Sequence, residues 1–240
     1  MYFGAQMNGG MKKTLMLLSL TLGLAIVNTT QAQFRVGPTG GLNFNRQVFK
    51  SNTHRYDALF RTRLGFHLGV LTDLIINDNL SLQTELLYTQ KGGYYKIERP
   101  DITEEYTANL GYVSLPVCLT AKLDVRSAWL FIGAGPYINR LLHSNHTYTS
   151  NGFNLENGKL RIGTDYNSDQ VKPYDAGIKV KAGFELKKGM YMSAFYDIST
   201  SDINPQFTVT RNKTFGVQLA YIFSTTEEDR YNRFENFYEF

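Results

Sequence analysis

The sequence predicts an all-β fold, namely an eight-stranded antiparallel up-and-down transmembrane β-barrel. The clearest observation is a pair of alternating strands between Leu64 and Tyr88, joined by the turn Ile76-Asn77-Asp78-Asn79. In both strands one face is uncharged and mostly apolar, while the other face carries His, Asp, Gln and Glu side chains. Such a pair fits a wall with lipid on one side and a polar interior on the other. The same pattern in other segments and the lengths of the connections are the two further observations.

Six more segments are expected to form strands. They are 34–47, 112–123, 129–142, 174–186, 190–199 and 213–223. In the strands predicted at 112–123, 174–186 and 213–223, one face is apolar and the other consists of polar or small residues. Both faces of the strand at 129–142 are apolar, and the facing of the strand at 190–199 is ambiguous. The sequence therefore does not assign an inward face to either strand. Pro116, in the fourth strand, cannot donate a ladder hydrogen bond and therefore predicts a β-bulge.

The connections between the predicted strands are short and long in turn. The short ones are 76–79, 124–128 and 187–189, and the long ones are 48–60, 96–109, 143–173 and 200–208. Outer-membrane barrels have short turns in the periplasm and long loops outside the cell, so we expect 143–173 to be extracellular. A soluble calycin has the same strand order but an apolar interior. The inward faces of the two hairpin strands and of the strand at 174–186 are polar or glycine-rich, which favours the membrane barrel.

The first 32 residues have the three parts of a secretory signal peptide. A basic start at Met11-Lys12-Lys13 precedes the apolar run Leu15–Val27, and Thr30-Gln31-Ala32 offers a cleavage site. The predicted organisation is a signal peptide at 1–32, with translation from Met11 as one reading, and a barrel at 33–223. An uncleaved membrane anchor is the alternative for the leader.

Composition agrees with export to a membrane. Hydrophobic residues make up 42% of the chain and aromatic residues 14%, and the mean hydropathy is −0.28. These values suit a barrel, because only alternate residues meet lipid. The net charge of +4 arises from scattered basic residues, so no nucleic-acid partner is predicted. Cys118 is the only cysteine, which excludes an intrachain disulfide, and we expect it to be a packed strand residue.

The inward-facing polar residues of the predicted strands are expected to fill a narrow lumen with a hydrogen-bonded charge network. An eight-stranded barrel has room mainly for side chains, so the role of this network is structural. Its predicted members are His67, Asp73, Glu85, Lys122, Lys179, Lys181, Glu185 and Gln218.

Two motifs have spacings that occur in metal sites. His143 and His146 have a His-x-x-His spacing, but a site would need further ligands nearby. The 165–169 segment places Asp165, Asn167 and Asp169 as in an EF-hand loop, yet Gln170 and Ala176 stand where glycine and glutamate are required. We predict no metal site and no cofactor.

Three segments resemble a known family. They are Val36–Phe44 (VGPTGGLNF), Tyr112–Val117 (YVSLPV) and Ile132–Tyr137 (IGAGPY). They resemble the PorT-like family of small outer-membrane β-barrels, and the resemblance covers 34–223. It implies a bacterial outer-membrane location and, from the member that names the family, a role in secretion. The segment 224–240 departs from a barrel that ends on its last strand, and we expect a periplasmic tail, either a short helix or a docking segment.

The predicted function is a non-enzymatic outer-membrane barrel that acts as a structural, binding or secretion-associated component. Outer-membrane lipid would surround it, and secretion or other envelope proteins would be reached through the loops or the tail. A lipid hydrolase is one alternative, since His67 with Ser81 or Ser114 supplies residues of the right type, although without triad spacing. A small narrow channel is another.

Overall fold

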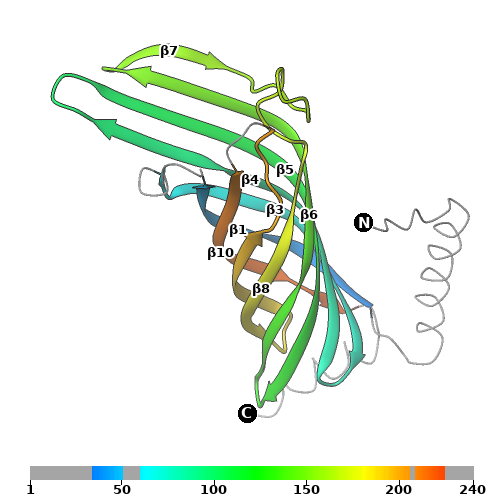
Figure 1. The fold of residues 1–240 in the computed structure, drawn as a ribbon. Helices are drawn as coiled ribbons and strands as arrows, with labels where there is room; N and C mark the ends of the chain where they lie inside the picture. Colours follow the sequence, from blue (N-terminus) through cyan, green and yellow to red (C-terminus); the bar gives the residue numbers. More distant parts are fainter. Residues whose placement is uncertain (1–33, 51–59, 206–208, 225–240) are drawn as a thin grey trace, which may run out of the picture.

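Eight long strands close into a ring in the computed structural model of the protein (Figure 1). The structure describes residues 34–50, 60–205 and 209–224. The strands are β1 (Phe34–Lys50), β2 (Phe60–Arg61), β3 (Arg63–Asn77), β4 (Leu80–Glu98), β5 (Thr103–Val125), β6 (Ala128–Ser150), β7 (Phe153–Gly158), β8 (Tyr174–Leu186), β9 (Met190–Ser199), β10 (Val209–Tyr221) and β11 (Phe223–Ser224). Each long strand pairs antiparallel with its neighbour, and β10 pairs with β1, so the predicted up-and-down barrel is confirmed.

Three short turns lie at one end of the barrel, which we call the turn end. They connect β3 to β4, β5 to β6 and β8 to β9, at 78–79, 126–127 and 187–189. Arg126 and Gly189 have φ angles of 47° and 90°, in the left-handed region that tight hairpin turns use. The start of β1 and the end of the described chain pair with each other here through Arg35 and Ser224. We call the opposite end the loop end.

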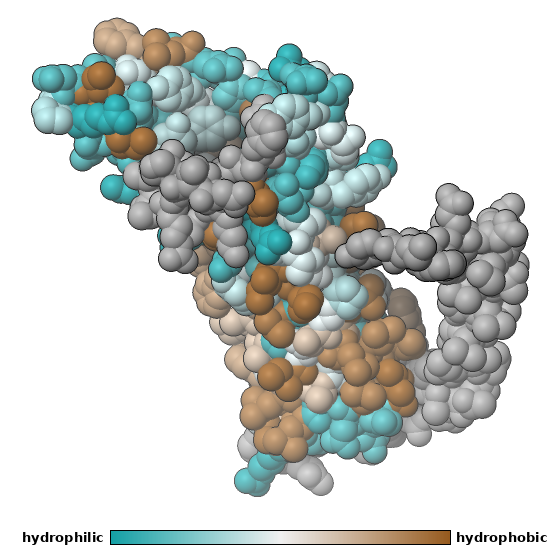
Figure 2. Space-filling view, in the orientation of Figure 1, coloured by the Kyte–Doolittle hydropathy of each residue, from teal (hydrophilic) through white to brown (hydrophobic). Residues whose placement is uncertain are grey.

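Apolar side chains cover the outside of the barrel, and Figure 2 shows them as a brown region below a more hydrophilic upper part. We call this surface the lipid belt. Every wall strand contributes to it, with Leu42, Leu68, Leu86, Leu119, Ile132, Val180, Met192 and Leu219 as examples. Leu68 of β3 is 63% exposed and Ile132 of β6 is 66% exposed. Surface of this kind suits contact with lipid chains.

The structure also gives the inward faces of the two strands that the sequence left unassigned. On β6, Phe131, Tyr137 and Asn139 point into the barrel, and on β9 the alternation from Tyr191 to Ser199 places the odd-numbered residues inside. The hairpin faces predicted from the sequence are those in the structure, since Leu68 is exposed while His67 is buried.

Two of the predicted long loops consist partly of strand. The segment 96–109 is a continuation of β4 and β5 around a turn at 99–102, and 143–173 begins with the rest of β6 and with β7. The predictions were wrong for these parts of the two segments, because the pairing of β4 with β5 and of β5 with β6 continues far beyond the lipid belt. Polar residues in these segments interrupt the alternation of apolar residues from which strands are predicted. Backbone hydrogen bonds between paired strands do not require that alternation.

The predicted bulge at Pro116 was also wrong. The register between β5 and β6 is the same at Pro116 and at Leu119, so no residue is inserted there. The register shifts instead beside Gly111 and Tyr112, where Leu142 of β6 is the extra residue. Pro116 points inward and interrupts the ladder without changing its register.

Beyond the barrel, three wall strands continue and are joined by β7 in a flat extension that leans away from the barrel axis (Figure 1). We call this the projecting sheet. It consists of 93–98 of β4, 103–108 of β5, 146–150 of β6, and β7, and the short β2 pairs with β4 at its other edge.

Two irregular segments, 159–173 and 200–205, cover the loop end of the barrel. Val171 and Ile203 are buried and pack with Leu110, Tyr112 and Leu141, and Leu160 lies against the same cluster. Backbone hydrogen bonds hold the two segments, because Lys172 N donates to Ile203 O at 2.8 Å and Leu141 N donates to Pro173 O at 2.8 Å.

No helix among the described residues is long and apolar enough to cross a membrane. The predicted signal peptide and all of the predicted tail except Ser224 lie outside the described residues.

The lipid belt makes a direct prediction. Replacing Leu68 with arginine places a charge on the outer surface between the two ends, and we expect the unfolding free energy to fall by about 2–4 kcal/mol. Guanidinium titration of the barrel refolded into phospholipid vesicles measures this change. Asn145→Arg, also exposed but beyond the lipid belt on β6, should leave stability unchanged. Equal behaviour of the two variants would contradict the placement of the belt.

Candidate functional site

Ten charged side chains point into the barrel and are buried there. Five are basic and five acidic, namely Arg35, Lys91, Lys122, Lys179 and Lys181 with Asp73, Glu85, Asp175, Glu185 and Asp197. The described lumen is therefore balanced in formal charge. Balance is required because a buried charge without a partner is strongly destabilising.

The first group of charges lies near the turn end. Arg35 on β1 is directly paired with Asp73 on β3, so both side chains share the inner face. The Arg35 guanidinium binds Asp73 and also reaches Glu185, with Nη2 donating to Oε2 at 3.0 Å. Lys122 Nζ lies 2.7 Å from Asp73 Oδ2 and 3.6 Å from Glu185 Oε2. Two cations and two carboxylates thus form a closed set.

The second group fills the middle of the barrel. Lys181 Nζ donates to Glu85 Oε1 at 2.8 Å, and Lys179 Nζ lies 3.8 Å from the other oxygen of the same carboxylate. Lys179 is also 3.5 Å from Asp197 Oδ1 and sits 3.8 Å above the centre of the Phe195 ring. The ring face favours a cation, so Lys179 is stabilised from three sides.

Lys91 joins this group to Asp175. Its Nζ lies 3.4 Å from Asp197 and 3.7 Å from Asp175. Four polar side chains donate to the Asp175 carboxylate, namely Asn139, Ser199, Ser201 and Asn212, at 2.5–3.2 Å. With so many donors fixed around it, Asp175 is held in one position.

The two remaining predicted members of the network are held by neutral partners. His67 Nδ1 lies 2.7 Å from Asn43 Oδ1, and its ring packs edge-on against Phe195. Gln218 Nε2 donates to Thr39 Oγ1 at 2.7 Å and its carbonyl accepts from Ser193. Neither Ser81 nor Ser114 hydrogen-bonds to His67, and Ser81 Oγ has no hydrogen-bond partner in the described chain.

Apolar side chains also lie in the interior, beside the buried polar residues. Leu71, Phe131, Tyr191, Ala220 and Ile222 form a buried cluster in the turn-end half, where the rings of Phe131 and Tyr191 stack at 4.7 Å. Together with the cluster that covers the loop end, they place apolar contacts on both sides of the central charges. The arrangement is a packed plug of the kind that an eight-stranded barrel accommodates.

The projecting sheet carries a row of aromatic residues on the face continuous with the lumen. Tyr95, Tyr106 and Tyr148 lie on adjacent strands in direct register. The first two rings stack at 5.4 Å, and Tyr148 donates to Glu104 at 3.0 Å. Burial raises the pKa of the Tyr106 hydroxyl to about 12. The sheet is therefore internally packed although it stands outside the barrel.

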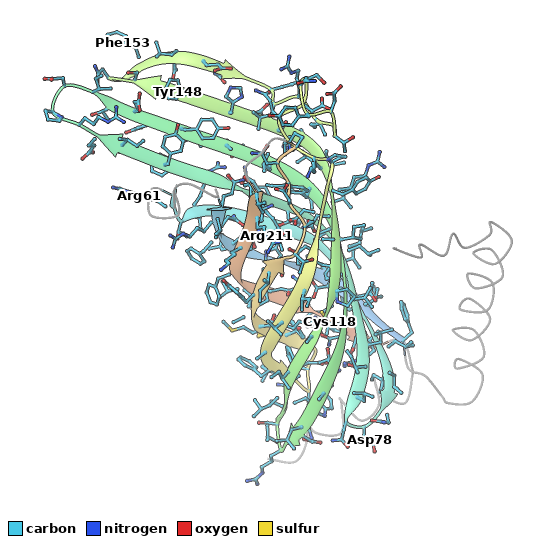
Figure 3. All side chains as sticks on the ribbon, viewed as in Figure 1. Arg61, Asp78, Cys118, Tyr148, Phe153 and Arg211 are labelled. Atoms are coloured by element: carbon cyan, nitrogen blue, oxygen red, sulfur yellow. The ribbon has the colours of Figure 1, made fainter. Side chains whose placement is uncertain are left out.

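The outer edge of the projecting sheet is β7. It pairs with β6 on one side, and no described strand pairs with its other side. Phe153 and Leu155 are 74% and 64% exposed. Figure 3 shows Phe153 at the edge farthest from the barrel. Leu155 is the extra residue of a bulge opposite Tyr148 and Thr149.

The two histidines of the His-x-x-His motif do not converge. His143 lies on the outer face and stacks against Tyr88, whereas His146 lies on the inner face with its Nε2 3.0 Å from Glu156. The Asp165–Asp169 segment is a turn in which Asp165 N donates to Asp169 Oδ2 at 2.8 Å. Within the described residues, no three His, Cys, Asp or Glu side chains are grouped to hold a metal ion.

A family model described as "Outer membrane protein beta-barrel domain" matches residues 28–204, which is most of the chain. The chain belongs to this family. This outer membrane protein beta-barrel domain accordingly resides in the bacterial outer membrane, as predicted. Since short turns face the periplasm in such barrels, we expect the turn end there and the projecting sheet outside the cell.

Several solved outer-membrane proteins are similar to this barrel domain. Ail, the attachment invasion locus protein of Yersinia pestis, is 13% identical, with 80% of this chain and 99% of that chain covered and a TM-score of 0.40. OprG from Pseudomonas aeruginosa is 10% identical, with 81% and 97% covered and a TM-score of 0.42. Neisserial surface protein A is 14% identical, with 78% and 96% covered and a TM-score of 0.38. No curated protein matches the chain.

The structure places all eight predicted network residues of this barrel domain inside the lumen. It brings Asp73, Lys122 and Glu185 into one group and Glu85, Lys179 and Lys181 into another, while His67 and Gln218 contact neutral side chains.

Sequence reasoning missed four charged members, Arg35, Lys91, Asp175 and Asp197. The alternation contained a signal for three of them. Arg35 precedes the outward Val36, Lys91 continues the odd-numbered inward series of its strand, and Asp175 has the parity of Lys179. Asp197 lies on the strand whose faces the sequence did not decide.

Charge balance in the lumen predicts a large cost for removing one carboxylate. Glu85→Gln leaves Lys179 and Lys181 without their shared carboxylate charge, and we expect a loss of about 3–5 kcal/mol in the unfolding free energy. Adding Lys181→Gln restores formal balance, so the double variant should be more stable than Glu85→Gln alone. Lys187→Gln, which breaks an exposed 3.4 Å pair with Asp124, is the control and should cost less than about 1 kcal/mol. A Glu85→Gln cost as small as that of the control would overturn this account.

The expected topology can be tested with single cysteines. Phe153→Cys should react with a membrane-impermeant maleimide on intact cells, whereas Asp78→Cys at the turn end should react only after the outer membrane is permeabilised (Figure 3). The native Cys118 is buried in the barrel and should stay unlabelled until the protein unfolds, which makes the unmodified chain the internal control. The reverse labelling pattern would invert the topology.

Proposed function

We propose that this outer-membrane barrel is a non-enzymatic anchor that presents the projecting sheet to a binding partner outside the cell. The observation that carries the proposal is the open edge of β7. An edge strand with unpaired backbone groups is a template for pairing with another chain. The edge is also exposed along its length and carries the large apolar side chains Phe153 and Leu155.

The edge of β7 has little of the protection that edge strands usually carry. It contains no lysine and no proline, and Glu156 is its single charged residue. Its shortness and the bulge at Leu155 are the two features that limit pairing with a stray strand. A partner that adds a strand here would gain main-chain hydrogen bonds, and pockets for alternate side chains would give selectivity.

The interior of the barrel supports an anchor better than a pore. The charges are paired across the lumen, and apolar clusters lie toward both ends. An aqueous path would need polar groups that remain hydrated, whereas Lys179 and Glu85 are almost fully buried against each other and their neighbours. A narrow channel is therefore the weaker interpretation.

A lipid hydrolase is also the weaker interpretation. Its chemistry needs a serine, a histidine and an acid in hydrogen-bonded sequence. His67 instead faces Asn43 and Phe195 inside the barrel. Neither serine considered from the sequence donates to its ring.

A secretion-associated partner is the version of the proposal that the PorT-like resemblance favours. The resembling segments lie in β1, β5 and β6 and belong to the barrel wall, where Pro116 pairs with Tyr137. They are wall residues, so the resemblance supports the barrel more than it supports any particular partner. The tail at 224–240 is a second place where an envelope protein would dock.

Photo-cross-linking in living cells tests the proposal. A benzophenone side chain at Phe153 or Leu155 should give one discrete protein adduct, because the partner strand lies against β7. The same group at Leu68 should give lipid adducts. At Asp78 it should not give the protein adduct seen from Phe153 or Leu155. With the cross-linker moved to Asn157, Phe153→Asp combined with Leu155→Asp should abolish the adduct while the barrel still folds.

Two results would contradict the proposal. One is the absence of any adduct that depends on Phe153 and Leu155. The other is steady single-channel conductance of the purified protein in planar bilayers, which would show that the lumen is a pore.

A further inference from the structure

The open edge of β7 carries a projecting ring at one end and a gap at the other. Phe153, at the end farthest from the barrel, is 74% exposed (Figure 3). Gly158 is at the end nearest the barrel. A Cβ atom built on Gly158 would meet only His146 Cε1 among the described residues, at an ordinary contact distance of 3.8 Å. We call Phe153 the knob of this edge and Gly158 its notch.

The knob and the notch lie on the same face of the projecting sheet. Directly paired residues of antiparallel strands share a face, and β7 pairs Phe153 with Ser150 and Gly158 with His146. Ser150 and His146 are four residues apart on β6, so they also share a face. A second β7 strand running antiparallel to the first would therefore place its knob over the notch of the first, and its notch against the knob.

One register pairs the whole of β7 with a second β7 through a twofold axis. The opposed pairs in that register are Phe153 with Gly158, Asn154 with Asn157, and Leu155 with Glu156. An aromatic ring packed over an edge glycine compensates for the missing side chain, and two opposed asparagines can exchange amide hydrogen bonds. Glu156, the single charged residue of the strand, does not stand opposite its own counterpart, and its Oε1 lies 3.0 Å from His146 Nε2 of the same chain.

We infer that the partner of β7 is a second copy of this chain, paired with it edge to edge. This inference rests on the proposed function, because it names the strand that the open edge receives. Backbone hydrogen bonds would join the two β7 strands into one continuous sheet. The twofold axis would repeat the contact between knob and notch at both ends of the pair, as in any isologous interface.

The antiparallel pairing also decides how the two barrels face. β6 runs from the turn end of the barrel into the projecting sheet, where it pairs antiparallel with β7. When two β7 strands pair antiparallel, the two β6 strands run in opposite directions, and the two turn ends point away from each other. Barrels in two facing membranes have this arrangement, whereas neighbours in one membrane point the same way. The second copy therefore belongs to a facing outer membrane.

The contact is small, because β7 has six residues. Interfaces of small area are weak, but many copies on two facing membranes gain avidity from one another. We therefore expect the protein to be monomeric in dilute detergent and to hold membranes together only where many copies face each other.

Clustering of lipid vesicles that carry the full-length protein tests this inference. Vesicles with unmodified protein should cluster. Phe153→Asp removes the knob and Gly158→Lys fills the notch, so vesicles that carry either variant alone should not cluster. Mixing these two populations should restore clustering. In a mixed pair the introduced aspartate meets the introduced lysine, and the remaining ring meets the remaining glycine.

Asn145→Lys is the matched control, because Asn145 is exposed on β6 but does not lie on the open edge. This variant should cluster like the unmodified protein, and heat-dependent gel mobility should show that all three variants are folded. Clustering by Phe153→Asp or Gly158→Lys alone, failure of the mixture to cluster, or loss of clustering in Asn145→Lys would each overturn the inference.

The mass of the benzophenone adduct separates this inference from the proposed function. In dense cultures, the adduct formed from Phe153 or Leu155 should have twice the mass of the chain. An adduct of another mass would overturn the second copy and leave the proposed function standing. The absence of any adduct would overturn both.

Discussion

The rest of the structure depends on the ladder between β1 and β10. In hydrocarbon every backbone N–H and C=O group must be paired within the protein, so a sheet can cross the membrane only if its first and last strands meet. Here they pair in continuous register from Thr39 with Ala220 to Lys50 with Val209. Closure then fixes which face of each strand meets lipid, because side chains alternate strictly across a strand. The lipid belt and the filled lumen are two consequences of the same ring.

Closure also explains why the interior charges come as a balanced set. The ring leaves a space that side chains fill, and within it Arg35, Lys179 and Glu85 have almost no contact with solvent. A carboxylate there is stable only if cations reach it from other strands. The pairs accordingly join residues far apart in sequence, such as Arg35 with Glu185. This bonding joins β1 to β8 across the lumen, although the two strands are not neighbours in the wall.

The projecting sheet follows from strands that do not end where the membrane ends. β4, β5 and β6 continue their ladders beyond the lipid belt, where the alternation of apolar residues is no longer required. A row of tyrosines packs one face, and β7 ends the sheet with an open edge. The same chain thus carries, beyond the lipid belt, a sheet whose last described strand has an unpaired edge.

The sequence by itself determined the barrel, its eight wall strands, the outward residues of most strands and the inward position of eight polar residues. These follow from the period of two, which each strand carries locally. Tertiary structure decided what that period does not encode. The inward face of β9, and with it Asp197, was decided by pairing with β8 and β10, since aromatic residues lie on both faces of that strand. The length of β5 and β6 beyond the lipid belt was decided by backbone pairing. Polar residues are compatible with either a paired strand or a loop, so the sequence alone does not show where these strands end. The partners of Arg35, Lys91 and Asp175 depended on which strands meet across the lumen, because an ion pair requires proximity in space and not in the chain.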